Sequence, residues 1–265
     1  MNVYLHELRM ARGSLVGWIA ALVLVMALFL SIFPAFHADV ETSRKLLAGF
    51  PPQVRAMFGL SMETFFTFLG FYAYTFTYVG VAGAVQGMNM GLTMLSREVT
   101  SKTTDFLLTK PLTRTSIFVR KLLAVLTAIT VTNIVLVAST LGLTIVFGAG
   151  NFSMKVFGLL SLAFLLVQLM FVSIGVLVSQ LVRIKSVIAI SLGVVFGFFA
   201  LGMIQSLAGD SILRLVSPFK FFDYMKIVAD KTFEVQFVYM AIAVIIIPLV
   251  IAYVVYVRHD TRSVA

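Results

Sequence analysis

The side chains that could take part in chemistry inside the long apolar runs of this sequence are amides. No Asp, Glu, His, Lys or Arg lies within those runs. Amides form hydrogen bonds between helices or line a weakly polar path, and neither role moves a proton. Because a proton-coupled carrier or an ion pump needs acids or histidines at membrane depth, the amides disfavour a self-powered transporter. The candidates for a pathway or for helix packing are Gln86, Asn89, Asn133 and Gln205.

Residue sets for catalysis and metal binding are missing from the sequence. It contains no phosphate-binding loop, no dinucleotide glycine fingerprint, no His-Glu-x-x-His pair and no Gly-x-Ser-x-Gly elbow. His6, His37 and His259 lie in separate segments, and there is no cysteine. Serine and threonine are plentiful, but no histidine or acid accompanies them in the runs to act as a base. We therefore expect no catalytic residue, no metal site, no cofactor and no ATP hydrolysis on this chain.

The elements that must position the amides are membrane helices. The chain of 265 residues is 60% hydrophobic and 12% charged, with a mean hydropathy of +1.05. A soluble domain is roughly 45–50% apolar and about 25% charged. The net charge of +9 does not indicate a nucleic-acid partner, because the bases lie at the ends of apolar runs. Such bases are typical of topology signals and of contacts with membrane lipids.

Six charge-free apolar runs, each long enough to cross a bilayer, predict six spanning helices. Runs this regular favour helices over a β-barrel, whose strands alternate every second residue. We expect an all-α integral membrane fold with one transmembrane domain over residues 1–265. The first run is too long for a cleaved signal peptide and ends at bulky Phe36, so we expect a retained anchor. The expected spans are residues 15–36, 64–95, 118–148, 156–182, 186–208 and 236–257.

The Lys and Arg residues predict that both termini are cytoplasmic. With the N-terminus inside, the inner segments hold two bases before the first span and six between the second and third. They hold two more between the fourth and fifth spans and two after the last, which makes 12 of the 20 bases. An excess of bases on the cytoplasmic side sets the orientation of membrane proteins. We expect a multi-pass protein of the cell (plasma or inner) membrane.

Two segments outside the spans have helical periodicity. Residues 210–234 predict a short amphipathic helix at the outer surface, and an ordered loop with incidental periodicity is the alternative. Residues 2–18 predict an interfacial helix on the inner face, with Trp18 at the level of the headgroups. The apolar residues at helical spacing in the outer segment are Phe219, Phe222, Met225 and Val228.

Glycine recurs at every fourth position in two of the spans. This spacing puts bare backbone on one face of a helix, so that a second helix can approach closely. The sequence leaves open whether the second helix belongs to the same chain or to another copy. The glycines are Gly83, Gly87 and Gly91 in the second span and Gly193 and Gly197 in the fifth.

The cytoplasmic segment between the second and third spans is basic and rich in threonine. A connector between antiparallel spans needs only about four or five residues, and residues 97–114 are far longer. Thr100 or Ser101 is placed to cap a short helix that Pro111 would end. Thr113 or Thr115 is placed to cap the third span. An amphipathic helix here could lie on anionic lipid or dock in a groove of a partner.

The residues of this segment resemble the cytoplasmic signature of permease subunits of type-2 ABC exporters. In that family an acidic residue precedes Gly-Thr, two or three leucines, Pro, a small or hydroxyl residue, Arg and then a Lys that enters the next helix. Lys102 stands where the family has glycine, so the turn there differs. The matching residues are Thr103, Leu107, Leu108, Pro111, Thr113, Arg114 and Lys121.

The resemblance implies a six-helix membrane half that dimerises, as a homodimer or a heterodimer. ATP and Mg²⁺ would be bound by a separately encoded ATP-binding subunit, and residues 97–114 would be the coupling segment that contacts it. Export, as opposed to import, is implied by the resemblance alone. The implied coupling residues are Glu98, Thr103, Asp105, Phe106, Leu107, Leu108, Pro111 and Arg114.

The sequence leaves two other classes of function open. A secondary carrier or a channel would need no partner, although ionisable groups are expected in its spans. A membrane anchor, an assembly factor or an intramembrane enzyme is the second class. The aromatic residues of the second span would suit an amphipathic or apolar substrate, but aromatic residues in a span more often serve packing.

Overall fold

The computed structural model describes residues 3–100, 113–147, 150–182, 184–209 and 211–258, without the side chains of residues 96–100 and 211–213. Over these residues the regular elements are helices, with no strand. They are α1 (Val3–Ala38), α2 (Val40–Ala48), α3 (Pro52–Phe58), α4 (Phe68–Thr100), α6 (Arg114–Val146), α7 (Met154–Leu181), α8 (Val187–Ala208), α9 (Ser211–Val216), the 3₁₀ helix η1 (Pro218–Lys220), α10 (Tyr224–Asp230) and α11 (Val235–Arg258).

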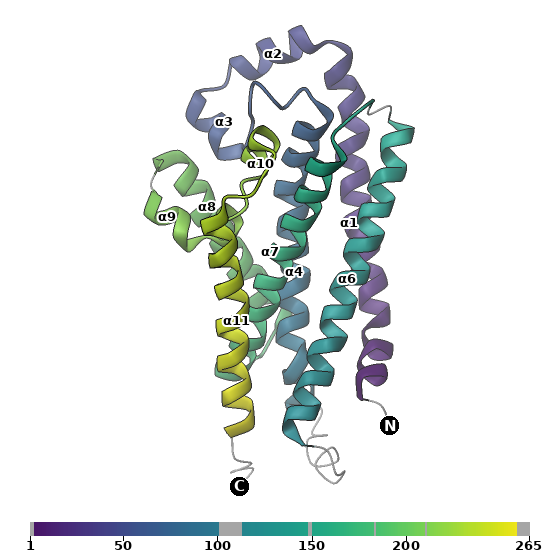
Figure 1. Ribbon diagram of the computed structural model, residues 1–265, viewed down its shortest axis with the longest axis vertical. Coiled ribbons are helices and arrows are strands. Elements are labelled where there is room, and N and C mark those ends of the chain that lie inside the picture. The colour runs from purple at the N-terminus through teal and green to yellow at the C-terminus, as the bar shows by residue number, and fades with distance from the viewer. Residues whose placement is uncertain (1–2, 101–112, 148–149, 183, 210, 259–265) are drawn as a thin grey trace.

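Six of the described helices, α1, α4, α6, α7, α8 and α11, are long and apolar enough to cross a membrane. This confirms the all-α integral membrane fold. The short helices α2 and α3 cover the end of the bundle opposite to both chain termini (Figure 1). The last turn of α4 and the first turn of α6 lie at the end that carries the termini.

Local chemistry explains where several helices begin and end. Thr113 caps α6, because its hydroxyl accepts a hydrogen bond from the backbone N–H of Ser116. Asp223 caps α10 in the same way. Gly59 ends α3 and Gly209 ends α8, each with a left-handed backbone conformation that glycine adopts without strain.

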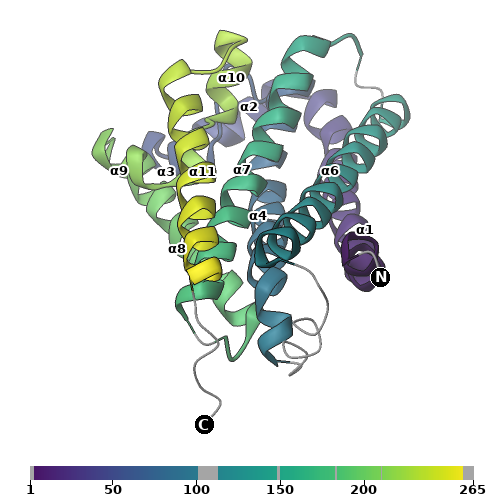
Figure 2. The same ribbon diagram turned by 60° about the horizontal axis from the view of Figure 1, so that its bottom comes forward.

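The centre of the bundle is the pair α4 and α7, which make the most extensive helix contact. In its most apolar stretch, 72% of the residues of α4 are buried, against 11% for α11. Figure 2 shows α1 and α6 together on one side of the central pair and α8 and α11 on the other. The outer helices therefore present most of their apolar side chains outward, where lipid or another chain can cover them.

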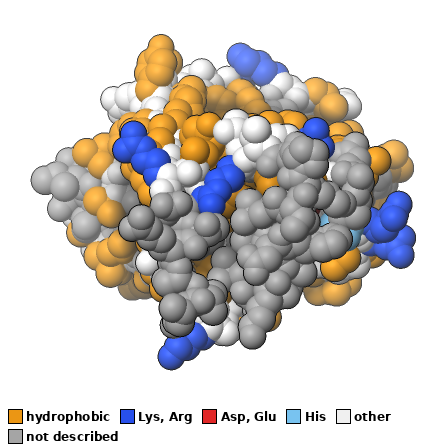
Figure 3. All heavy atoms as spheres, turned by 90° about the horizontal axis from the view of Figure 1, so that it is seen from below, with side chains coloured by type: hydrophobic (Ala, Val, Ile, Leu, Met, Phe, Trp, Pro, Cys, Tyr) orange, Lys and Arg blue, Asp and Glu red, His pale blue; other side chains and the backbone are white. Residues whose placement is uncertain are grey.

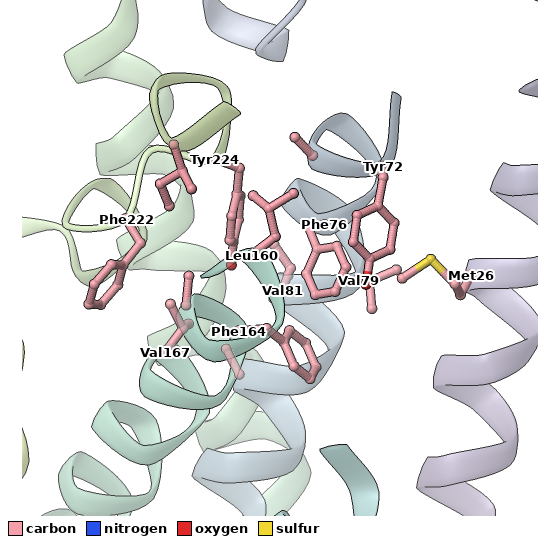
Figure 4. Close-up of a cluster of buried hydrophobic side chains, with 14 of the residues drawn as sticks. Met26, Tyr72, Phe76, Val79, Val81, Leu160, Phe164, Val167, Phe222 and Tyr224 are labelled. Carbon is pink, nitrogen blue, oxygen red and sulfur yellow. The ribbon is translucent and has the colours of Figure 1, made fainter. Parts of the chain in front are cut away.

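An aromatic cluster fills the core between α4, α7 and α10 (Figure 4). Tyr72 stacks on Phe157, with ring centroids 5.0 Å apart. Phe76 meets the ring of Phe164 edge-on at 5.3 Å and the ring of Tyr224 at 5.8 Å. Such pairs add attraction to the burial of the rings. The aromatic residues of the second span thus serve packing to a large extent.

The interfacial helix expected over residues 2–18 is not separate from the first span. α1 runs from Val3 to Ala38 without a break, which makes it about 54 Å long. Its first turns lie along α6, where Tyr4 Oη and Thr127 Oγ1 share a hydrogen bond of 3.1 Å. One face of this segment thus packs on a neighbouring helix, while Leu5, Met10 and Val16 stay exposed.

The amphipathic helix expected over residues 210–234 is also corrected. The segment divides into α9, η1 and α10, because Pro218 begins the 3₁₀ helix and Asp223 starts α10 anew. Phe222 is 2% exposed, so it belongs to the core rather than to a lipid surface. The periodicity of the apolar residues reflects burial against α4, α7 and α8.

The second spanning helix begins at Phe68, four residues later than the expected Thr64. A turn precedes it, in which Thr67 Oγ1 donates to Thr64 O over 2.7 Å and accepts from the backbone N–H of Gly70 over 3.1 Å. A Cβ at Gly70 would lie 1.8 Å from Thr64 O. Only glycine leaves room for the chain to fold over the start of α4.

Candidate functional site

Two of the expected coupling residues lie in the helix ends that flank residues 101–112. Glu98 is in the last turn of α4, and Arg114 is the first residue of α6. Both helix ends lie on the face that carries the termini, where Figure 3 shows Lys and Arg side chains spread over the surface. The other expected coupling residues fall outside the described residues: Thr103, Asp105, Phe106, Leu107, Leu108 and Pro111.

The start of α6 is attached to the end of α11. Arg114 Nη1 donates a hydrogen bond to Tyr256 O over 3.3 Å, and the hydroxyls of Thr115 and Tyr253 lie 3.0 Å apart. Phe118 packs against the rings of both tyrosines, with centroids 5.4 and 5.8 Å away. A displacement of the first turn of α6 would therefore be transmitted to α11.

A buried ion pair joins the start of α6 to α1 and α4. Lys121 is 2% exposed, and its Nζ donates to Glu7 Oε1 over 2.8 Å and to Met94 O over 3.0 Å. The Glu7 side chain is 22% exposed. A buried ammonium is tolerated when a carboxylate and hydrogen bonds compensate its lost hydration. The three helices are thus held together one to two turns from the coupling segment.

The sequence offers only a weak signal for this ion pair. Lys121 ends a basic segment, and Glu7 lies among the polar residues before the first charge-free run. Both resemble ordinary residues at the membrane surface, and 114 positions separate them. The pairing depends on the parallel packing of α1 and α6, which local sequence patterns do not determine.

Two of the candidate amides meet in one buried cluster. Gln168 on α7 accepts a hydrogen bond from Asn133 Nδ2 and donates to Gln86 Oε1 over 3.0 Å. Gln86 Nε2 in turn donates to Thr132 Oγ1 over 2.9 Å. The chain of bonds links α4, α6 and α7 in the middle of the bundle. In this structure the amides of Gln86 and Asn133 are engaged in helix packing.

The other two candidate amides lie in separate places. Asn89 is half-buried and lines a small cavity of about 40 Å³ together with Glu7, Thr93 and Lys121. Gln205 lines a larger cavity of about 360 Å³ at the opposite end, between α3, α8 and α10. The structure therefore does not join the four candidate amides into one continuous polar path.

The glycines of α4 are packed against α7. A Cβ at Gly87 would lie 2.6 Å from Gln168 O, and a Cβ at Gly91 would lie 2.2 Å from Val172 O. A Cβ at Gly83 would meet the ring of Phe164 at 2.5 Å. By contrast, a Cβ at Gly193 or Gly197 would meet no atom within 4 Å. Among these five glycines, close approach within the chain thus concerns those of the second span and not those of the fifth.

The polar network at the opposite end centres on Glu234. Its carboxylate accepts hydrogen bonds from Arg214 and from Lys226 Nζ, the latter over 2.7 Å. Burial by itself raises the pKa of Glu234, but the bonds and charges of these two bases outweigh it and lower that pKa below its usual value. Over the described residues, no three His, Asp or Glu side chains lie close enough to hold a metal.

The comparisons with known proteins agree with this architecture. The sequence model described as "ABC-2 family transporter protein" matches residues 1–261, which is nearly the whole chain. The chain belongs to the ABC-2 transporter family. The resemblance seen in the cytoplasmic segment is thereby confirmed. The comparison with curated proteins finds no match.

Membership of the ABC-2 family, together with six apolar helices, makes the chain a membrane permease of a transporter. It agrees with a bundle whose helices are joined by buried amides.

Proposed function

We propose that this ABC-2 permease is driven by ATP hydrolysis on a separate subunit, which it contacts through residues 97–114. The observation that carries the proposal is the family match over residues 1–261. ATP and Mg²⁺ bind to the partner and not to this chain. Two permease copies, embedded in membrane lipid, form the substrate pathway, and the transporter works as an exporter.

The contacts around the start of α6 support a coupling role. Arg114 and Phe118 attach it to α11, and Lys121 attaches it to α1 and α4. Closure of the ATP-binding subunits would move the coupling segment, and the attached helices would move with it. A ligand shifts an equilibrium only if its contacts differ between the two states, so the ATP-binding subunits would contact residues 97–114 differently in the inward-open and the outward-open permease.

The distribution of bases supports a cytoplasmic location of the same end. The described bases near the termini and the start of α6 are Arg9, Arg12, Arg114, Arg120, Lys121, Lys185 and Arg258. Together with the bases outside the described residues they make up the 12 of 20 expected inside. The protein lies in the cell membrane with both termini in the cytoplasm.

Affinity purification from mild detergent tests for the partner. The tagged chain should retain an ATP-binding subunit in near-equal amount, as measured by mass spectrometry. Replacement of residues 97–114 by a flexible linker of equal length should release it. A chain that copurifies with no ATPase, across detergents and after crosslinking, would contradict the proposal.

Single substitutions test the coupling residues. Glu98→Ala and Arg114→Ala should lower substrate-stimulated ATP hydrolysis while the membrane domain still folds, as judged by its thermal unfolding. Lys185→Ala is the matched control, because Lys185 is an exposed base at the same end but outside the coupling segment. Undiminished stimulation in both variants would refute the assignment of these two residues.

A further inference from the structure

The larger cavity of this permease has the dimensions of a small-molecule site. It measures about 360 Å³, and typical ligand pockets range from about 300 to 1,000 Å³. Its walls come from α3, the last turns of α8, η1 and the start of α10. It lies at the end opposite to the coupling segment, and no role in coupling accounts for it.

One wall of the cavity is apolar and well packed. Phe199, Met203, Phe219 and Met225 line it. The ring of Phe219 lies 5.7 Å from Phe199 and 5.1 Å from Phe171 on α7, measured between centroids. Because α7 supports this wall from behind, the wall is preformed rather than dependent on a ligand.

Lys220 provides a cation at the same cavity. It is half-buried, and its Nζ donates a hydrogen bond to Ser206 Oγ. The stem of Lys220 lies against α8 at Gly202, where a Cβ would be 3.4 Å from Lys220 Cγ, an ordinary contact distance. No carboxylate of the described residues forms an ion pair with Lys220.

Two described acids near the cavity, Asp223 and Glu234, accept hydrogen bonds from other groups. Asp223 also lines the cavity, but its Oδ1 accepts the backbone N–H groups of Met225 and Lys226, at 3.1 and 3.2 Å. Glu234 is paired with Arg214 and Lys226. Burial lowers the pKa of Lys220, Asp223 counteracts this, and Arg214 adds to it. Among the described residues, the half-buried ammonium of Lys220 thus has Asp223 nearby but no carboxylate in an ion pair with it.

We infer that this cavity binds an anionic amphiphile, with its acidic group on Lys220 and its apolar body along the wall formed by Phe199, Met203, Phe219 and Met225. A carboxylate or phosphate would form a charge-assisted hydrogen bond with the Lys220 ammonium, and an acyl chain would displace water from the apolar wall. The source is a free fatty acid or an anionic phospholipid. This inference is independent of the ATP-binding partner and of the direction of transport.

Binding to the purified full chain in non-ionic detergent tests the inference. Native mass spectrometry would follow the titration of dodecanoate, with dodecan-1-ol as the uncharged probe of equal length and phosphatidylglycerol against phosphatidylcholine as the lipid pair. Lys220→Met should weaken the binding of the acid about tenfold or more, because a charge-assisted hydrogen bond is lost. Lys226→Met is the matched control, since Lys226 is exposed and paired with Glu234, and its affinity should equal that of the wild type.

A second variant gives an independent test in case Lys220→Met does not fold. Ala56 is an exposed residue on α3 at the rim of the cavity, so Ala56→Phe should fold and block the site. If Lys220→Met and Ala56→Phe both lose the binding of dodecanoate, the cavity is a fatty-acid site. If both lose the binding of phosphatidylglycerol, it is a lipid site. Three results would overturn the inference. They are binding of dodecan-1-ol as tight as that of dodecanoate, unchanged affinity for the anion in either variant, and no binding of dodecanoate or phosphatidylglycerol to the wild type.

Discussion

Lys121 places a charged group inside a bundle that is otherwise held by apolar and amide side chains. Its ammonium is tolerable because Glu7 and the carbonyl of Met94 replace the water it has lost. At the opposite end, Glu234 has a comparable role for Arg214 and Lys226, in a more exposed setting. The two clusters differ in burial, so their substitution should affect stability to different extents.

Replacing Glu7 by Gln should destabilise the folded chain by about 1–3 kcal/mol, because the Lys121 ammonium would remain buried without its counter-charge. Thermal unfolding in detergent measures the loss. Arg9→Gln is the control on the same helix, since Arg9 is exposed. If the two variants unfold at the same temperature, the ion pair does not stabilise the fold.

The stability of the Glu234 cluster should depend on acid pH. The pKa of Glu234 is lowered in the folded chain from 4.5, so the folded state binds fewer protons than the unfolded one. The stabilisation is present above pH 4.5 and is lost as the pH falls through the folded pKa. Its size should be about 0.5–1 kcal/mol, because the group is partly exposed. Unfolding curves of wild type and Glu234→Gln should converge in acid, and a constant difference between them would contradict this.

At the scale of the helices, α4 holds the bundle together. Its glycine face meets α7, its amide Gln86 joins the buried cluster, and its last turns receive the bond from Lys121. The outer helices α8 and α11 make fewer contacts and expose apolar side chains. Substitutions on α4 should therefore affect folding, whereas those on the outer face of α8 should affect only what covers that face.

Gly91→Val and Gly193→Val form a matched pair for this difference. Valine at position 91 would push α4 from α7, because its Cβ would overlap Val172 O. We expect a loss of about 1–3 kcal/mol or more for Gly91→Val. Gly193→Val should leave the thermal unfolding of one chain nearly unchanged.

Crosslinking of the same two variants adds a second measurement. A specific loss of crosslinked dimer in Gly193→Val would place the glycines of α8 in a seam between two copies. If Gly193→Val lowers the unfolding temperature as much as Gly91→Val does, the predicted difference between α4 and α8 is wrong.

The whole molecule has one end with both termini and another end with the short helices and the larger cavity. The first end is the cytoplasmic one in the proposed orientation, and the second faces outward. A ligand in the cavity would therefore reach it from the outer leaflet or the outer solution. The coupling segment and the cavity would act on the same bundle from opposite sides.

The absence of cysteine makes the orientation measurable. Lys185→Cys and Lys231→Cys introduce one thiol each, on the α7–α8 and the α10–α11 connections. A membrane-impermeant maleimide should label Lys231→Cys in intact cells and Lys185→Cys only after the membrane is opened. The reverse pattern would invert the proposed topology.

The sequence by itself determined the class of fold, because a run of about 20 apolar residues has few stable structures other than a spanning helix. It likewise carried the resemblance to the ABC-2 family, because the residue types and their order in residues 97–121 are local properties. The glycine spacing of α4 predicted a close contact with another helix. It did not indicate that this neighbour is α7.

Only the tertiary structure decided the contacts between distant residues. The bond from Lys121 to Glu7, the amide cluster around Gln168 and the cavity at Lys220 each join separate helices. The periodicity of residues 210–234 predicts a surface helix, since a buried face and a lipid-facing face have the same apolar pattern. Packing, and not periodicity, distinguishes the two, because it depends on which other helices are in reach.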